Sequence, residues 1–283
     1  GILHDGQEVA VKKIPALFFK ESVYDEINIV INLKHENIIR PMGYCHEIIM
    51  VLCHRQGKYI GGQSMIFCFI EKLMRNGSME HFITTGIYKK TSRHGLFDWS
   101  FCFHIILGTA QGVCYLHEQR VVHLDLKPDN ILFGSDMNPR ISDFGLAIKL
   151  VHVDDEITRD GSVAGTLRYM APEYLGEGII SIKCDVYAFG VIIFRTIGLM
   201  NRCESPVRDD CAGWAEVAQD AGRLKELFGP AKVDQPQLME IKRCIEVAVL
   251  CTQNDRHKRP IMADVLLMLS GEKEIPIPEK ALA

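Results

Sequence analysis

The stretch VVHLDLKPDN at residues 121–130 constrains the fold of this chain more than any other. Two valines form a short apolar, strand-like run, and a histidine, a carboxylate, an amine and an amide follow within eight residues. The triplet Asp-Phe-Gly follows at 143–145, and Ala-Pro-Glu follows at 171–173. These polar side chains, placed directly after a predicted strand, form the candidate site.

The residue types in this cluster suit the transfer of a phosphoryl group. Such a transfer needs a carboxylate to receive the hydroxyl proton, oxygen ligands for Mg²⁺ and cations on the phosphates. Asp125 can be the carboxylate, and Lys127 can neutralise the phosphate as charge shifts. Asn130 and Asp143 supply hard oxygen ligands of the kind that Mg²⁺ takes.

The first part of the chain, to about residue 70, is rich in short β-branched runs. These runs lie at 8–14, 37–45 and 64–70. In the segment 20–33 the apolar residues follow the spacing of one helix face, namely Val23, Ile27, Val30 and Ile31. The sequence therefore predicts a sheet with one helix across it.

Beyond the Asn-Gly-Ser triplet at 76–78 the pattern becomes helical. Apolar residues recur at three- and four-residue steps in four segments, at 101–119, 185–198, 238–252 and 260–270. Pro260 suits the first turn of the last helix, and Gly271 lies where a C-terminal glycine belongs. The segments 86–95 and 154–165 are predicted loops. The fold class is α+β, with a small β-rich lobe followed by a larger α-rich lobe.

Composition narrows the classes of partner and compartment. The chain has 283 residues, 47% of them hydrophobic, which is enough to bury a large core. The formal net charge of −4 gives no case for a nucleic acid or an anionic membrane. Ten cysteines without a CxxC pair indicate reduced thiols in an intracellular protein. We expect no signal peptide and no membrane span of ~18 apolar residues, because Arg195 ends the best candidate at 186–194.

HLDLKPDN, DFG and APE together resemble the signature set of protein kinases, and matching stretches run from the first residues to about residue 270. VVHLDLKPDNILF, ISDFGLA and GTLRYMAPEY are similar to plant receptor-like protein kinases. Lys127 and Thr166 match the serine/threonine pattern rather than the tyrosine pattern. The resemblance implies a bilobal fold, with residues 1–73 as the small lobe and 74–283 as the large one. It also implies ATP, Mg²⁺ and a protein substrate.

The resemblance assigns further residues to the nucleotide site. Lys12 follows the V-A-x pattern of the phosphate-anchoring lysine, with Ala10 beside it near the adenine. We expect Glu26 to form an ion pair with Lys12, although a solvated surface glutamate is the alternative. The hinge stretch is one or two residues longer than the usual form, so the adenine-contacting positions stay open. The candidates are Phe69, Ile70 and Glu71.

Four residues have structural interpretations. Asp185 is either an acid favoured by a helix N-terminus or the buried acceptor that holds the catalytic-loop backbone, and both can be true. Arg259 matches the position that pairs with Glu173 of the APE motif, against a basic nucleic-acid patch as the alternative. His123 is expected to be a packed scaffold residue rather than a general base.

Leu124 stands where many kinases carry an arginine before the catalytic aspartate. That arginine grips a phosphorylated residue of the activation segment, which leucine cannot do. The pattern resembles the non-RD receptor-like kinases. The candidate phosphorylation positions are Thr158, Ser162 and Thr166. Arg195, where relatives commonly have glutamate, has no clear consequence.

The chain begins at GILHDGQEVAVKKI, which in the resembled family corresponds to the end of the second strand and all of the third. The first strand and the glycine-rich loop are expected upstream. Two function classes stay open. One is an ATP-dependent serine/threonine kinase domain, the cytoplasmic part of a membrane-anchored receptor-like kinase. The other is a kinase-shaped scaffold or binding module with little catalysis.

Overall fold

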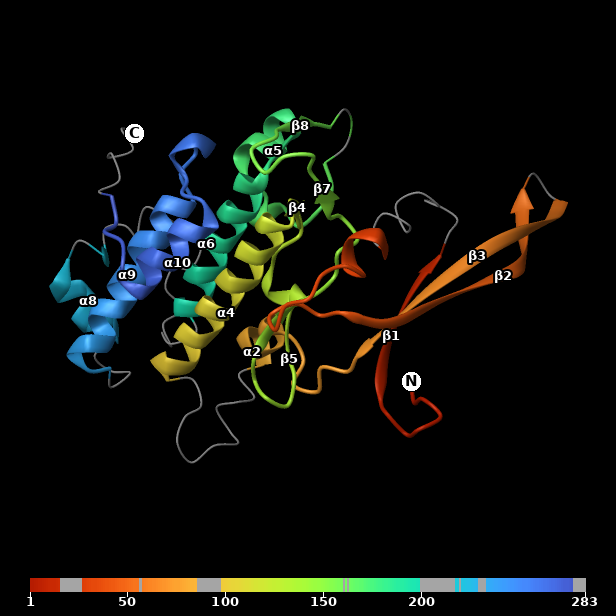
Figure 1. Cartoon of the computed structure of the whole chain (residues 1–283), viewed down its shortest axis with the longest axis horizontal. Coiled ribbons are helices and arrows are strands. Elements are labelled where there is room, and N and C mark those ends of the chain that lie inside the picture. The colour runs from red at the N-terminus through yellow and green to blue at the C-terminus, as the bar shows by residue number, and fades with distance from the viewer. Residues whose placement is uncertain are drawn as a thin grey trace.

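The computed structural model describes residues 1–15, 27–55, 58–85, 98–159, 161, 163–198, 217–218, 220–228 and 233–276. A three-stranded sheet lies on one side of the molecule and a body of packed helices on the other (Figure 1). The strands β2 and β3 run together away from the helices, while the start of the chain stays near β1. The α+β fold class that the sequence predicts is confirmed.

The sheet is antiparallel, in the order β1-β3-β2. Its strands are β1 (Val9–Pro15), β2 (Pro41–Arg55) and β3 (Lys58–Lys72). β1 and the end of β3 match the predicted runs. β2 begins four residues later than predicted, because the preceding residues pair elsewhere. Ile39 donates its N–H to the Ile141 carbonyl at 2.9 Å, and Ile141 donates to the Asn37 carbonyl at 2.8 Å.

The residues before β1 fold back on it. Gly1 and Val9 exchange backbone hydrogen bonds of 2.8 and 2.9 Å, and Ile2 forms a bridge with Glu8. The turn at 3–6 includes Gly6 at φ 83°, a conformation that glycine adopts without strain. The start of β1 is therefore paired on its outer side.

The predicted helix at 20–33 falls partly outside the described residues. Residues 27–30 are helical, and Ile27 and Val30 are buried as predicted. The inclusion of Ile31 in the buried face was wrong, because the helix ends at Val30 and the Ile31 side chain is 47% exposed. Ile29 and Leu33 are buried instead.

The helical body contains α2 (Met79–Thr85), α4 (Trp99–Glu118), α5 (Pro172–Glu177), α6 (Ile182–Gly198), α8 (Ala221–Phe228), α9 (Gln235–Cys251) and α10 (Met262–Ser270). Short 3₁₀ turns are η1 (Pro128–Asn130), η2 (Leu167–Tyr169) and η5 (Arg256–Lys258). Three two-stranded pairs connect these elements. They are β4 (Val121–Val122) with β7 (Ile148–Lys149), β5 (Ile131–Phe133) with β6 (Pro139–Ile141), and β8 (Ile157–Thr158) with β9 (Ile179–Ile180).

Recognisable end signals fix several helix boundaries. Asp98 caps α4 by accepting the Phe101 N–H at 2.9 Å, and Asp234 forms a capping box at the start of α9. Gly271 ends α10 at φ 82°, as predicted. The prediction that Pro260 lies inside the first turn was wrong, because Ile261 is the N-cap and α10 begins at Met262.

The core lies where α4, α6 and α9 pack together. Among the described helices, α4 alone is long and apolar enough to cross a membrane by length and composition. The sequence prediction of no such segment overlooked it. Its apolar residues are buried inside the helical body, including Ile105, Ile106 and Leu116. Its length and hydropathy therefore reflect its position at the centre of the core.

Candidate active site

The backbone of the loop after β4 is held by one buried carboxylate. Asp185, at the start of α6 and 1% exposed, accepts the His123 N–H at 2.7 Å and the Leu124 N–H at 3.0 Å. Leu124 has φ 64°, a left-handed conformation that costs energy for a residue with a side chain. The two charge-assisted hydrogen bonds offset that cost and fix the direction in which the next residue leaves the loop.

His123 joins this loop to the segment that carries Asp143. Its side chain is fully buried, with Nε2 3.0 Å from the Ser142 carbonyl and Nδ1 accepting the Asp125 N–H at 3.3 Å. The ring also packs on Phe144, with the ring centroids 5.0 Å apart. A fully buried ring with both nitrogens engaged is placed as a scaffold and has no access to a substrate.

The Asp125 carboxylate accepts hydrogen bonds from three polar side chains, those of Lys127, Thr166 and, at 3.2 Å, Asn130. Lys127 Nζ donates to Asp125 Oδ2 at 2.7 Å, and the Thr166 hydroxyl donates to Oδ1 at 3.1 Å. Lys127 also donates to Thr166 Oγ1 at 2.9 Å, which closes a triangle of three side chains. Asp125 keeps 12% of its side chain exposed, so the carboxylate is held in place at the edge of solvent.

Asn130 and Asp143 are brought together by the residue between them. Ser142 donates both its N–H, at 2.9 Å, and its hydroxyl, at 3.1 Å, to the Asn130 carbonyl. The Asn130 amide nitrogen donates to the Asp125 carbonyl at 2.8 Å. Because the nitrogen is used in this way, the amide oxygen is the atom available to ligate a cation.

Asp143 is a half-exposed carboxylate beside a lysine. Its Oδ1 lies 2.7 Å from Lys12 Nζ, and 45% of its side chain is exposed. Burial alone would raise the pKa of Asp143, but the hydrogen bond and charge of Lys12, with the Gly145 N–H, outweigh it and lower the pKa. Asp143 also has φ 64°, which an aspartate tolerates better than most residues. The carboxylate is thus ionised and accessible to a cation.

The sheet places Lys12 and two of the hinge candidates on one face. Lys12 pairs with Phe69, and Ala10 pairs with Glu71, so these four share the face that carries Lys12. The Lys12 ammonium lies 5.9 Å from the centroid of the Phe69 ring. Ile70, the third hinge candidate, belongs to the opposite face of the sheet, paired with Val11. Glu26, the predicted partner of Lys12, lies outside the described residues.

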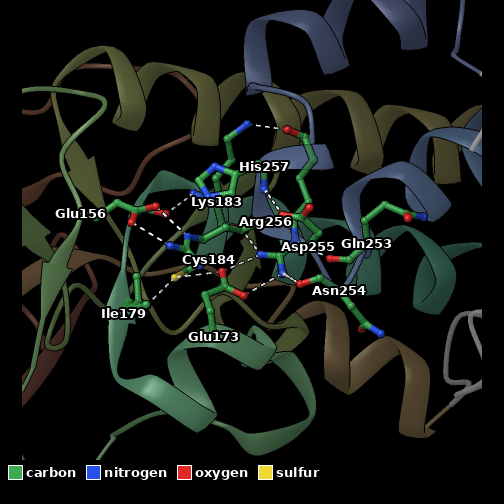
Figure 2. Close-up of polar contacts among 12 residues, drawn as sticks. Glu156, Glu173, Ile179, Lys183, Cys184, Gln253, Asn254, Asp255, Arg256 and His257 are labelled. Atoms are coloured by element: carbon green, nitrogen blue, oxygen red, sulfur yellow. Dashed lines mark hydrogen bonds and ion pairs between the residues drawn. The ribbon is translucent and has the colours of Figure 1, made fainter. Parts of the chain in front are cut away.

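Arg259 is buried against the carboxylate of Glu173. Nη1 and Nη2 each donate to one Glu173 oxygen at 2.7 Å, and Arg259 is 1% exposed. Figure 2 shows Glu173 directed at the turn that contains Gln253 and Asn254. The structure therefore brings this predicted pair together, as a two-pronged contact inside the protein and not as a basic surface patch.

The positions proposed for phosphorylation differ in their surroundings. Thr158 is exposed in β8, Thr166 belongs to the Asp125 triangle, and Ser162 lies outside the described residues. Leu124 is buried in an apolar cluster that includes Leu150 and Met170. Its side chain brings no positive charge to this position.

Two of the ion pairs that the sequence interpretation missed join distant parts of the described chain. Arg256 pairs with Glu156, and Arg195 lies 3.6 Å from Glu80 of α2. Both join residues about a hundred positions apart, and no local pattern marks the partners. The unusual arginine at 195 was the one available signal, and its buried Nε makes no hydrogen bond.

Comparisons with known proteins agree with this geometry. Residues 2–268 match the protein kinase domain family. The chain is 35% identical over 279 residues to the G-type lectin S-receptor-like serine/threonine-protein kinase B120 of Arabidopsis thaliana, covering 96% of this chain and 30% of the relative. It is 33% identical over 289 residues to cysteine-rich receptor-like protein kinase 10 of the same plant, covering 99% and 40%. The chain thus spans roughly a third of the length of these relatives.

Proposed function

Because the chain belongs to the protein kinase domain family, we propose that it transfers the γ-phosphoryl group of ATP to a serine or threonine hydroxyl of a protein. The observation that carries this proposal is the Asp125 carboxylate, fixed between Lys127 and the Thr166 hydroxyl at the edge of solvent. Relatives named as receptor-like serine/threonine-protein kinases support the same acceptor class.

In this proposal Asp125 accepts the proton of the substrate hydroxyl as the hydroxyl oxygen attacks phosphorus. Lys127, 2.7 Å from that carboxylate, contributes positive charge beside the phosphoryl group during its transfer from ATP to the hydroxyl oxygen. Thr166 keeps both side chains in register. His123 and Asp185 do not touch substrate, and they hold the loop that presents Asp125.

The chemistry of the donor set fits Mg²⁺. The Asp143 carboxylate, ionised beside Lys12, and the Asn130 amide oxygen are hard oxygen ligands of the required kind. When bound there, the ion supplies neutralisation of phosphate charge. In the proposed nucleotide site Lys12 anchors the phosphates and Ala10 faces the adenine, and Glu26, outside the described residues, is the proposed partner of Lys12. Phe69, Ile70 and Glu71 are the proposed hinge.

We further propose residues 1–73 as the small lobe and 74–283 as the large lobe, with the nucleotide between them. The relatives are receptor-like kinases, which supports a location on the cytoplasmic face of the plasma membrane within a longer, membrane-anchored protein. The alternative of a scaffold with little catalysis, which the lack of a G-x-G-x-x-G motif in this sequence suggested, is not favoured. Lys12 bonds to Asp143, Asn130 bonds to Asp125, and Ser142 links the two pairs.

Phosphoamino acid analysis tests the proposal. The chain is incubated with γ-labelled ATP, Mg²⁺ and a general acceptor protein, with EDTA in a parallel reaction. We expect label on serine and threonine, none on tyrosine, and loss of transfer in EDTA. Label on tyrosine, or transfer that does not depend on a divalent cation, would contradict the assignment.

A further inference from the structure

A second ion pair joins the segment that follows Asp143 to the helical body. We call residues 154–166 the activation segment. Glu156, within it, accepts hydrogen bonds from Arg256 Nε to Oε1 at 2.7 Å and from Arg256 Nη2 to Oε2 at 2.9 Å. Figure 2 shows the two side chains facing one another across the gap between their backbones. This two-pronged geometry is the strongest form of an arginine–carboxylate contact.

Arg256 projects from a rigid base. It is the first residue of η5, whose N-cap Asp255 accepts the His257 N–H at 2.9 Å. Arg259, at the other end of the same turn, is locked in the buried pair with Glu173. The turn therefore has little freedom to follow the activation segment if that segment moves.

On the other side of the ion pair, the residues that follow Glu156 belong to a hydrogen-bonded strand pair. Thr158 in β8 pairs with Ile179 in β9, and the Arg159 N–H donates to the Gly178 carbonyl at 3.0 Å. Gly178 has φ 68°, and a Cβ there would lie 2.6 Å from the Arg159 carbonyl oxygen. Because only glycine allows the two backbones to come this close, the sequence at Gly178 favours the pairing of β8 with β9.

The far end of the activation segment reaches the catalytic carboxylate. The Tyr174 hydroxyl donates to the Ala164 carbonyl at 3.0 Å, while the Ala164 N–H lies 3.1 Å from the same hydroxyl. Two residues later, the Thr166 hydroxyl donates to Asp125. The segment is thus fastened near both ends, by Glu156 at one and by Ala164 and Thr166 at the other.

We propose that the Glu156–Arg256 ion pair positions the activation segment to receive a protein substrate. The Glu156 carboxylate holds the segment through its ion pair with Arg256. A phosphate on the segment would find no cation at Leu124, whose side chain packs in an apolar cluster. Glu156 and Arg256 are positioning residues and do not touch substrate. The inference rests on the proposed kinase function for its kinetic consequence, while the structural contact stands independently of it.

The test is a double-mutant cycle of Arg256→Gln, Glu156→Gln and the combined variant. Hydrogen exchange in a peptide spanning 155–161 reports on the Arg159 amide. We expect each single variant to exchange roughly three- to five-fold faster, and the combined variant no faster than either single one. The KM for the acceptor protein should rise by a similar factor, with the KM for ATP unchanged. Arg256→Lys, which keeps the charge but loses the second prong, should fall between the wild type and Arg256→Gln.

Lys273→Gln is the control. It removes another exposed ion pair, with Asp264 at 2.6 Å on α10, outside the activation segment. This variant should leave exchange at 155–161 and the acceptor KM at their wild-type values. Additive effects in the combined variant, or exchange equal to that of the control, would overturn the proposal. Faster exchange with an unaltered acceptor KM would also overturn it. If the wild type transfers no phosphate, the proposed function fails, and the exchange data alone decide whether the pair holds the segment.

Discussion

Replacing Arg259 with methionine should destabilise the helical body strongly. The guanidinium makes five hydrogen bonds, two to Glu173 and one each to the Gln253, Lys183 and Asn254 carbonyls. These bonds match the five N–H donors of an arginine. The central guanidinium carbon of Arg259, Cζ, also lies 5.0 Å from the centroid of the Tyr187 ring. Methionine fills much of the same volume but leaves the buried carboxylate without a charged partner, with only the weak Cys184 thiol donor at 3.8 Å.

The expected cost follows from that burial. The side chains of Arg259 and Glu173 are 0% and 4% exposed, and breaking such a pair by removing one partner costs about 3–5 kcal/mol. For a protein of this size, each kcal/mol lowers the unfolding midpoint by roughly 2–4 °C, which gives a decrease of roughly 6–20 °C. Removing the stranded charge as well, in Glu173→Gln/Arg259→Met, should recover part of that loss.

The assay is thermal unfolding followed by circular dichroism and by tryptophan fluorescence, to which Trp99, one of the two tryptophans and buried in α4, contributes. Arg256→Met is the matched control, because it breaks a two-pronged pair three residues away that has 21% and 39% of its side chains exposed. Exposed pairs contribute about 0–1 kcal/mol, so the control should lose less than about 4 °C. Equal losses in the two variants would refute the reasoning that burial sets the cost.

Three further predictions concern Leu124, the Glu156–Arg256 pair and the cysteines. Because Leu124 provides no cation for a phosphate, phosphatase treatment should change phosphotransfer activity by less than about two-fold, and a large loss would contradict this. The Arg256 hydrogen bond, against a smaller opposing effect of burial, lowers the pKa of Glu156 below its ordinary value of 4.5. The stability gap between the wild type and Arg256→Gln should therefore be constant above that value and close as the pH falls through the lowered pKa, as measured by urea unfolding at each pH. Cys45 is exposed, whereas burial raises the pKa of Cys102 to about 12, so iodoacetamide should label Cys45 and leave Cys102 intact in the folded protein.

The sequence predicted the elements that carry strong local signals. The β-branched run at 8–14 located β1, and the resemblance to the kinase V-A-x pattern selected Lys12 on it. The three- and four-residue spacing located α4, α6, α9 and α10 within a few residues. The order of Asp125, Asn130 and Asp143 along the chain indicated the chemistry, since each residue type matches one requirement of phosphoryl transfer.

Features that depend on contacts between distant segments could not be predicted. β2 starts late because Asn37 and Ile39 pair with Ile141, a partner that lies far along the chain. The Glu156–Arg256 pair likewise depends on where two loops meet in the folded molecule. The end of the helix at Val30 also escaped prediction, because Ile31 continues the apolar spacing without continuing the helix.

The most direct test of the proposed kinase function compares the wild type with Asp125→Asn in two measurements on the same samples. One is the rate of phosphate transfer to an acceptor protein, and the other is the rise in unfolding temperature caused by Mg²⁺–ATP. If Asp125 is the base, transfer should fall by roughly 10²–10⁴-fold. The rise in unfolding temperature should persist, because the nucleotide is held by other residues. Near-wild-type transfer in the variant, or no rise in unfolding temperature with Mg²⁺–ATP in the wild type, would contradict the account.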